Sequence, residues 1–135
     1  MRRLFSSKYS DNTISFALLL LRIFFGGLII PHGYDKLMHF TKYKAMFIDP
    51  FHVGMSTSLG LIIFAEFFCG ILLVIGLLSR FACVCLCIGM AVAVIYAHHW
   101  DIMGQGEHAT LYFGCFLALL FSGPGKFSFD RMIGK

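Results

Sequence analysis

The stretch LLRIFFGGLIIPHGYDKL, residues 20–37, indicates the kind of fold that this chain adopts. Its apolar run suits a lipid bilayer, although it contains Arg22 and continues into histidine, aspartate and lysine. The whole chain shares this character, because 59% of its 135 residues are hydrophobic, only 13% are charged, and the mean hydropathy is +0.82. Soluble domains are usually about 25% charged. The composition therefore predicts an integral membrane protein.

Four apolar segments predict four transmembrane helices. A helix needs about 20 residues to cross the hydrocarbon core, and helices are expected because backbone groups in lipid must be hydrogen-bonded within the protein. The phenylalanine-rich runs show no strand-like alternation. We therefore predict an all-α, integral membrane four-helix bundle that forms a single domain over residues 1–135, with helices at about 13–34, 57–78, 81–99 and 106–123.

Lysine and arginine residues predict the orientation of this bundle. Seven of them lie at the two ends of the chain or in the turn after the second segment: Arg2, Arg3, Lys8, Arg80, Lys126, Arg131 and Lys135. Three lie in the first loop: Lys36, Lys42 and Lys44. Because basic residues are enriched in cytoplasmic segments, both termini are predicted to be cytoplasmic. The first and third loops then face outward, which in the inner membrane of a bacterium is the periplasmic side.

Arg22 and Glu66 each lie inside an apolar segment. Arg22 is ~14 Å along the first helix at 1.5 Å per residue, and Glu66 is about as deep in the second helix counted from the opposite side. A charge at the centre of a membrane helix costs roughly 2.5–3.5 kcal/mol. We therefore predict that Arg22 faces the bundle interior and pairs with Glu66 through parallel hydrogen bonds. The pair would either fix the register of two helices or line a polar pocket or proton route.

A second polar cluster is predicted on the outer side. Six residues lie at the predicted outer ends of the helices: His32, Lys36, His98, His99, Glu107 and His108. Three interpretations stay open: interfacial residues that cap helices, a site for a quinone headgroup where a histidine and a carboxylate exchange protons with carbonyl oxygens, or a metal site. The spacing contains neither H-x-x-x-H nor H-E-x-x-H, so no metal is assigned.

The composition also argues against two function classes. The net charge of +4 is modest, and no basic patch is accompanied by polar side chains that could contact bases. No nucleic-acid partner is therefore expected. All five cysteines lie in apolar runs without a C-x-x-C pair. They are expected to be small packing residues, which argues against a disulfide-exchange enzyme.

Three longer stretches carry a family resemblance: LLLRIFFGGLIIPHGYDKL, AEFFCGILLVIGLLSRFA and GQGEHATLYFGCFLALLFSGPGKFSFDR. Together they resemble the DoxX family of small four-helix bacterial inner-membrane proteins. The resemblance singles out Arg22, His32, Gly33, Lys36, Glu66, Gly70, Arg80, Glu107, Pro124, Gly125, Ser128 and Asp130. It also implies a link to oxidoreductase systems, since some members are membrane subunits of thiosulfate:quinone oxidoreductase and others belong to complexes that handle oxidative stress.

These observations favour a membrane subunit associated with an oxidoreductase system, which binds a quinone or relays protons and electrons to a partner. Two alternatives remain: a non-catalytic membrane anchor or assembly partner, and a small-solute pathway within an oligomer. The expected partners are the lipid bilayer and either another protein or further copies of this chain. No catalytic residue is assigned, the chain is not assigned as an enzyme, and a quinone is the candidate cofactor.

Overall fold

The computed structural model describes residues 4–134, and all the regular structure in this range is helical. Three helices are long and apolar enough to cross a membrane: Asp11–Met38, Met55–Ile75 and Ser79–Ala97. The apolar helix Glu107–Ser122 is shorter. The prediction of an all-helical membrane protein is therefore confirmed. Arg2, Arg3 and Lys135, which were counted for the orientation, lie outside the described residues.

Each long helix contains a π-helical turn. The first consists of α1 (Asp11–Leu21), a π turn (Arg22–Gly26) and α2 (Gly27–Met38). The second consists of α4 (Met55–Ile63), a π turn (Phe64–Cys69) and α5 (Gly70–Ile75), and the third of α6 (Ser79–Val92) and a π turn (Ala93–Ala97). The remaining helices are α3 (Phe40–Met46), α7 (Glu107–Ser122) and α8 (Phe129–Ile133). Such turns often occur at functional sites, and two of these contain the charged residues Arg22 and Glu66.

The first long helix extends to Met38, beyond the end near residue 34 that the sequence suggested. Pro31 lies inside α2 without ending it. Membrane helices tolerate proline because neighbouring groups and local π adjustments satisfy the freed carbonyl. The extension matters for function, because it places Lys36 within the helix rather than in a loop.

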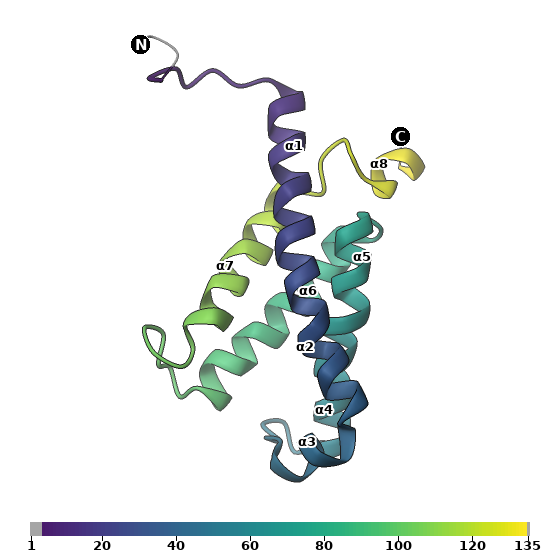
Figure 1. Ribbon diagram of the computed structural model, residues 1–135, viewed down its shortest axis with the longest axis vertical. Helices are drawn as coiled ribbons and strands as arrows, with labels where there is room; N and C mark the ends of the chain where they lie inside the picture. The colour runs from purple at the N-terminus through teal and green to yellow at the C-terminus, as the bar shows by residue number, and fades with distance from the viewer. Residues whose placement is uncertain (1–3, 135) are drawn as a thin grey trace.

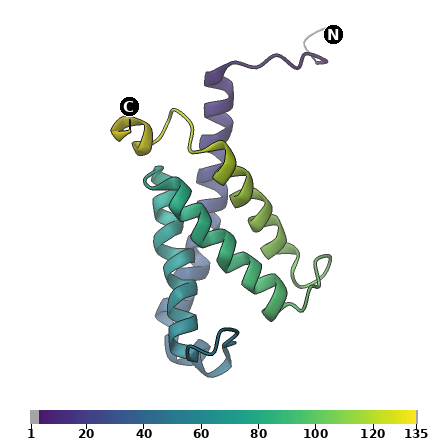
Figure 2. The same ribbon diagram turned by 180° about the vertical axis from the view of Figure 1, so that it is seen from behind.

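The helices run alternately up and down, and both ends of the described chain lie at the same end of the molecule (Figure 1). We call this the terminal end. At the opposite end, which we call the loop end, α3 and the connection to α4 lie beneath the first two long helices. From behind, α6 and α7 form a hairpin that is tilted against the first helix (Figure 2). The core lies where α5, α6 and α7 meet, and it includes Leu73, Cys83, Leu86, Phe116 and Leu119.

The first two long helices approach closely through glycine. A Cβ atom at Gly33 would lie 2.6 Å from the backbone nitrogen of Phe67 and 2.9 Å from the Cβ of Glu66. A Cβ atom at Gly26 would lie 2.8 Å from a side-chain carbon of Val74. Small residues at such contacts allow helix backbones to pack closely in membranes. Gly33 therefore determines how near α2 comes to the π turn that contains Glu66.

At the terminal end, residues 123–134 fold back onto the bundle, and we call them the carboxyl-terminal latch. The Asp130 carboxylate accepts hydrogen bonds from the N–H groups of Leu78 (2.7 Å) and Ser79 (2.8 Å). The N–H of Asp130 donates to the carbonyl of Gly76 at 2.8 Å. The N–H of Lys126 donates to the hydroxyl of Ser15 at 3.2 Å. The latch thus joins the start of α1 to the turn between α5 and α6.

We expect Gly33→Ala to lower the free energy of unfolding by roughly 1–3 kcal/mol, because the added methyl group overpacks a rigid backbone contact. Gly27→Ala is the matched control on the same helix, since a Cβ atom there meets nothing within 4 Å. Thermal unfolding of both variants in detergent is the measurement. Equal effects of the two substitutions would show that close helix contact at Gly33 does not stabilise the bundle.

The latch should weaken in acid. Burial alone raises the pKa of Asp130, but the N–H groups of Ser79 and Leu78 and the charge of Arg22 outweigh it, so the pKa lies below its ordinary value. The ionised carboxylate therefore stabilises the fold above the ordinary value of 3.8, and this contribution is lost as the pH falls through the lower folded value.

Asp130→Asn should lower stability by about 1 kcal/mol at pH 7, as the loss of a capping carboxylate does. The difference from the native chain should shrink below about pH 4, the ordinary range of a carboxyl group. Unfolding at a series of pH values tests this, with Asp11→Asn as the control, because the side chain of Asp11 is 85% exposed. A difference that stays constant with pH would contradict the assignment.

Candidate functional site

An apolar cavity of about 350 Å³ opens near the loop end of the bundle. We call it the loop-end cavity. Its walls come from α2, the second and third long helices, the start of α7 and the first loop, and they are mostly aliphatic and aromatic. Its polar lining residues are His32, Lys36, Ser58, Glu66, His98, His108 and Tyr112. Ligand sites commonly combine such an apolar cavity with a few convergent polar groups.

The central polar feature of the cavity is an ion pair between Lys36 and Glu66. The Nζ of Lys36 lies 2.6 Å from the Oε2 of Glu66, and the two side chains are only 19% and 7% exposed. Lys36 follows His32 by one helical turn, and its ammonium is also 3.5 Å from the carbonyl oxygen of His32. Glu66 belongs to the π turn that Gly33 allows to approach. A buried carboxylate and its countercharge therefore face an apolar space.

Arg22 does not pair with Glu66, contrary to the sequence prediction. Its side chain is fully buried near Gly76, which lies ten residues beyond Glu66, or ~15 Å along the helix at 1.5 Å per residue. The two charges are therefore at different depths. Lys36 takes the place of Arg22 because the longer first helix places it beside Glu66, and a lysine stem can lie along an apolar surface.

Arg22 instead contacts the latch. Its Nη2 donates a hydrogen bond to the carbonyl of Phe127. Its Nε and Nη1 have no hydrogen-bond partner within the part of the chain that the structure describes. Arg22 thus lies beneath the carboxyl-terminal segment, in a position suited to holding that segment on the bundle rather than to lining the loop-end cavity.

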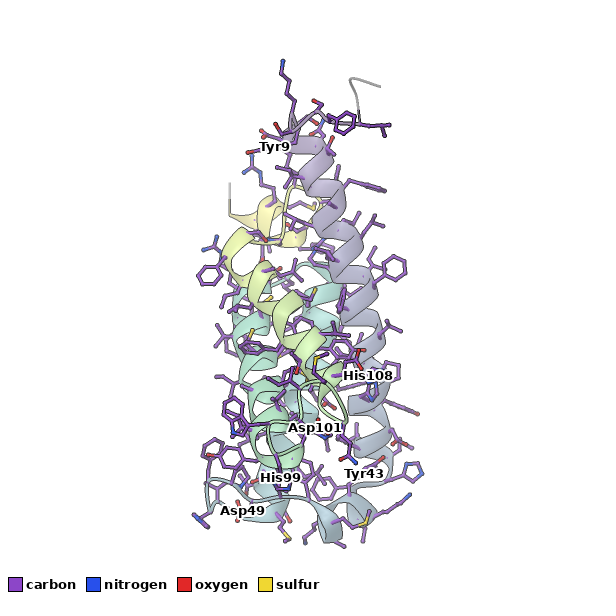
Figure 3. The ribbon with its side chains drawn as sticks, turned by 90° about the vertical axis from the view of Figure 1, so that its left-hand side faces the viewer. Tyr9, Tyr43, Asp49, His99, Asp101 and His108 are labelled. Atoms are coloured by element: carbon purple, nitrogen blue, oxygen red, sulfur yellow. The ribbon has the colours of Figure 1, made fainter. Side chains whose placement is uncertain are left out.

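The predicted outer cluster is brought together only in part. His32, Lys36, His98 and His108 line the cavity, whereas His99 and Glu107 are exposed and do not line it. In Figure 3 the labelled His99, Asp49 and Tyr43 lie toward the loop end of the molecule, while His108 lies further along the bundle. His98 and His99 are adjacent in sequence but separate in role, because the chain leaves the helix at His98 and reverses through a positive φ of 48° at His99.

Tyr112 was not predicted as a site residue. Its ring centroid lies 6.4 Å from that of His32 and 5.8 Å from that of Phe25, and the ring stacks on Phe116. The sequence did contain a signal, because Tyr112 follows His108 by four residues and so shares its helix face. Tyr112 adds a phenol to the polar end of the cavity.

The first loop covers part of the cavity and is held in place by Asp49. This carboxylate accepts hydrogen bonds at 3.0 Å from the N–H groups of Val53 and Gly54 and from the hydroxyl of Ser58. Burial alone raises the pKa of Asp49, but these three donors outweigh it and lower the pKa below its ordinary value. Asp49 thereby fixes the neighbouring Phe47 and Phe51, which line the cavity.

The donor set of the cavity is suited to hydrogen bonding and proton exchange. It offers one ammonium group, one carboxylate, three imidazoles, one phenol and the hydroxyl of Ser58. Among the described residues, no group of three or more His, Cys, Asp or Glu side chains is arranged to hold a metal ion. The five cysteines are free thiols, of which Cys69, Cys83 and Cys87 are buried in the core.

Comparison with known protein families supports the resemblance seen in the sequence. The family model described as DoxX matches residues 17–99, more than half of the chain. The matched range contains His32, Lys36, Glu66 and His98, but neither α7 nor the latch. No curated protein and no solved structure matches the chain significantly.

The Lys36–Glu66 pair gives a stability prediction. Lys36→Met removes one partner and leaves a buried carboxylate without its countercharge, which should lower the free energy of unfolding by about 3 kcal/mol or more. The double variant Lys36→Met/Glu66→Leu should recover most of this loss, because neither charge is then buried. A double-mutant cycle measured by unfolding in detergent tests the coupling. Additive effects of the two substitutions would contradict a direct pair.

Proposed function

This chain belongs to the DoxX family, and on that premise we propose that it is a membrane subunit of an oxidoreductase system whose loop-end cavity binds a quinone headgroup. It is a multi-pass membrane protein, as its three long apolar helices indicate. The observation that carries the proposal is the ion pair between Lys36 and Glu66, which lies 2.6 Å apart at the wall of an apolar cavity. A pair that served only packing would not need such a cavity beside it.

The cavity suits a quinone in size and in chemistry. Its volume of about 350 Å³ lies within the range of about 300–1,000 Å³ that is usual for small-molecule sites. The flat ring of a quinone would pack between apolar and aromatic side chains such as Ile62, Phe51 and Tyr112. The isoprenoid tail would leave through the open side of the cavity into lipid. The mostly apolar wall favours such a ligand over strongly charged, water-soluble substrates.

The polar residues have separate roles in this proposal. The ammonium of Lys36 donates a hydrogen bond to a carbonyl oxygen of the headgroup. Glu66 balances the charge of Lys36 and exchanges protons with the ligand oxygen, as a buried carboxylate near a reacting group can do. His32, His98 and His108 pass protons between the cavity and the outer surface, since an imidazole ring can both accept and donate a proton. Reduction of a quinone takes up electrons and protons in equal number, and the electrons come from the partner oxidoreductase.

The orientation that supports this function has both termini in the cytoplasm of a bacterial cell and the chain in its inner membrane. The charge distribution favours it, because seven basic residues lie at the ends of the chain and near the turn between the second and third helices. Only three lie toward the loop end: Lys36 near the end of α2, and Lys42 and Lys44 on α3. Both described ends of the chain lie at the terminal end of the molecule (Figure 1). The loop-end cavity would then open near the periplasmic surface, where an extracytoplasmic partner can reach it.

Native mass spectrometry of the protein released gently from its own membranes tests this function. We expect a bound quinone, lost in Glu66→Gln and in His32→Ala because each removes a polar group of the cavity. His99→Ala is the matched control, because His99 directly follows the lining residue His98 but does not line the cavity itself. It should keep the ligand.

Other outcomes would favour a different function. A stoichiometric second polypeptide without any quinone would indicate a non-catalytic anchor or assembly partner. A defined oligomer without ligand, together with solute flux in proteoliposomes, would indicate a small-solute pathway. Loss of the quinone from all three variants, His99→Ala included, would show that the loop-end cavity is not its site.

A further inference from the structure

A second hollow lies at the terminal end, opposite the loop-end cavity. It is an open groove of about 550 Å³ between the start of α1, the start of α6, the end of α7 and the latch. We call it the terminal groove. Its charged lining residues are Asp11, Arg80, Lys126, Asp130 and Arg131. Three cations thus face two carboxylates, and the proposed quinone site does not use any of them.

Both carboxylates of the groove are already engaged. Asp130 accepts hydrogen bonds from the backbone N–H groups of Leu78 and Ser79. Asp11 lies 3.8 Å from the Nζ of Lys126, which also donates to the side-chain oxygen of Asn12 at 3.2 Å. These contacts leave the acidic groups of the groove occupied within the protein.

The guanidinium groups of Arg80 and Arg131, the two arginines of the groove, are not engaged by other groups of the described chain. Within residues 4–134, neither Arg80 nor Arg131 has a carboxylate oxygen within 4.0 Å, and neither guanidinium makes a hydrogen bond. Two guanidinium groups therefore border the same groove with their donors available. Arginine binds phosphate through a planar fork of N–H donors, which gives this pair a preference for phosphate-like anions.

The backbone of the latch makes room for one of these arginines. Gly123 has a positive φ of 81° and is buried. A Cβ atom there would lie 3.4 Å from the Nη2 of Arg80 and 3.7 Å from its Nε. The guanidinium of Arg80 therefore lies against the bare backbone at the end of α7, and the glycine keeps this wall of the groove free of a side chain.

Apolar side chains lie along one side of the groove and next to it, and we call them its apolar rim. Ile14 and Leu18 of α1 line it directly. Close to it in the chain, Phe121 at the end of α7 and Ile133 of α8 are 77% and 72% exposed. In Figure 1 the start of α1, the end of α7 and α8 gather at this end of the molecule. A ligand with a phosphate and attached acyl chains would satisfy both the arginines and this rim.

We propose that the terminal groove binds the phosphate of an anionic phospholipid headgroup, between Arg80 and Arg131. Basic pockets between membrane helices recognise such headgroups. The acyl chains would lie along Ile14 and Leu18, in the lipid that surrounds α1. By joining the latch to α1 from outside, the lipid would stabilise the same end of the bundle that Arg22 holds from inside.

The test is native mass spectrometry of the full chain in detergent with added phosphatidylglycerol or zwitterionic phosphatidylcholine. Phosphatidylglycerol should bind better, and the variant Arg80→Gln/Arg131→Gln should bind it roughly thirtyfold more weakly, as expected for the loss of two basic contacts. The control Lys42→Gln/Lys44→Gln removes the same charge from the first loop and should bind as the native chain does. Equal loss in both variants, or equal binding of the two lipids, would overturn the proposal.

A competition experiment separates the lipid from a soluble ligand. Inorganic phosphate at the concentration of the lipid should not displace phosphatidylglycerol, because it lacks the acyl chains that contact the rim. Displacement at equal concentration would make the groove a site for soluble phosphate and overturn the lipid assignment. If the double variant does not fold, Arg131→Gln alone serves in its place, since Arg131 is exposed on α8. Neither variant alters the loop-end cavity, so a bound quinone should remain.

Discussion

A carboxylate buried in an apolar bundle must have a countercharge, and Glu66 meets this requirement through Lys36 at 2.6 Å. The loop-end structure depends on that contact. The first long helix has to continue through Pro31 to Met38 so that Lys36 lies at the depth of Glu66. Gly33 has to lack a side chain so that α2 can approach the π turn. The cavity, with its three histidines, then forms on the side of the pair that the two helices leave open.

The terminal end of the bundle also contains a buried charged group, Arg22, but its hydrogen-bond partner is different. Arg22 is as deeply buried as any residue between positions 4 and 134, yet its hydrogen bond goes to a backbone carbonyl of the latch rather than to a carboxylate. The latch is held in turn by Asp130, which accepts two backbone N–H groups at the start of α6. Arg22 of the bundle therefore binds the latch from beneath, and Asp130 of the latch binds the bundle at the start of α6. The apolar bundle thus has two polar assemblies at opposite ends: the Lys36–Glu66 pair beside the loop-end cavity, and the latch at the terminal end.

Parts of the site could be predicted from sequence because they follow from periodicity along one helix. His32 and Lys36 are four residues apart, so they share a face, and the ends of antiparallel helices must meet. In the structure, four of the six residues predicted for the outer cluster line one cavity: His32, Lys36, His98 and His108. The prediction failed for His99, because the chain reverses there through positive φ at His99 and Trp100. It also failed for Glu107, whose side chain is exposed at the first residue of α7. It also missed Tyr112, whose role depends on a ring packed against His32 from another helix.

The sequence by itself determined that this is a helical membrane protein, because apolar runs of that length allow few other structures in lipid, and it determined that the buried charges would need partners. Only the tertiary structure decided which partners they have. Depth along a helix can be counted from sequence, but the offset between two helices depends on where backbones approach at Gly26 and Gly33 and on how far the first helix continues. A shift of a few residues in the offset between the first two long helices decides whether Arg22 or Lys36 lies beside Glu66. For this reason Glu66 pairs with Lys36, and Arg22 is left to hold the carboxyl-terminal segment.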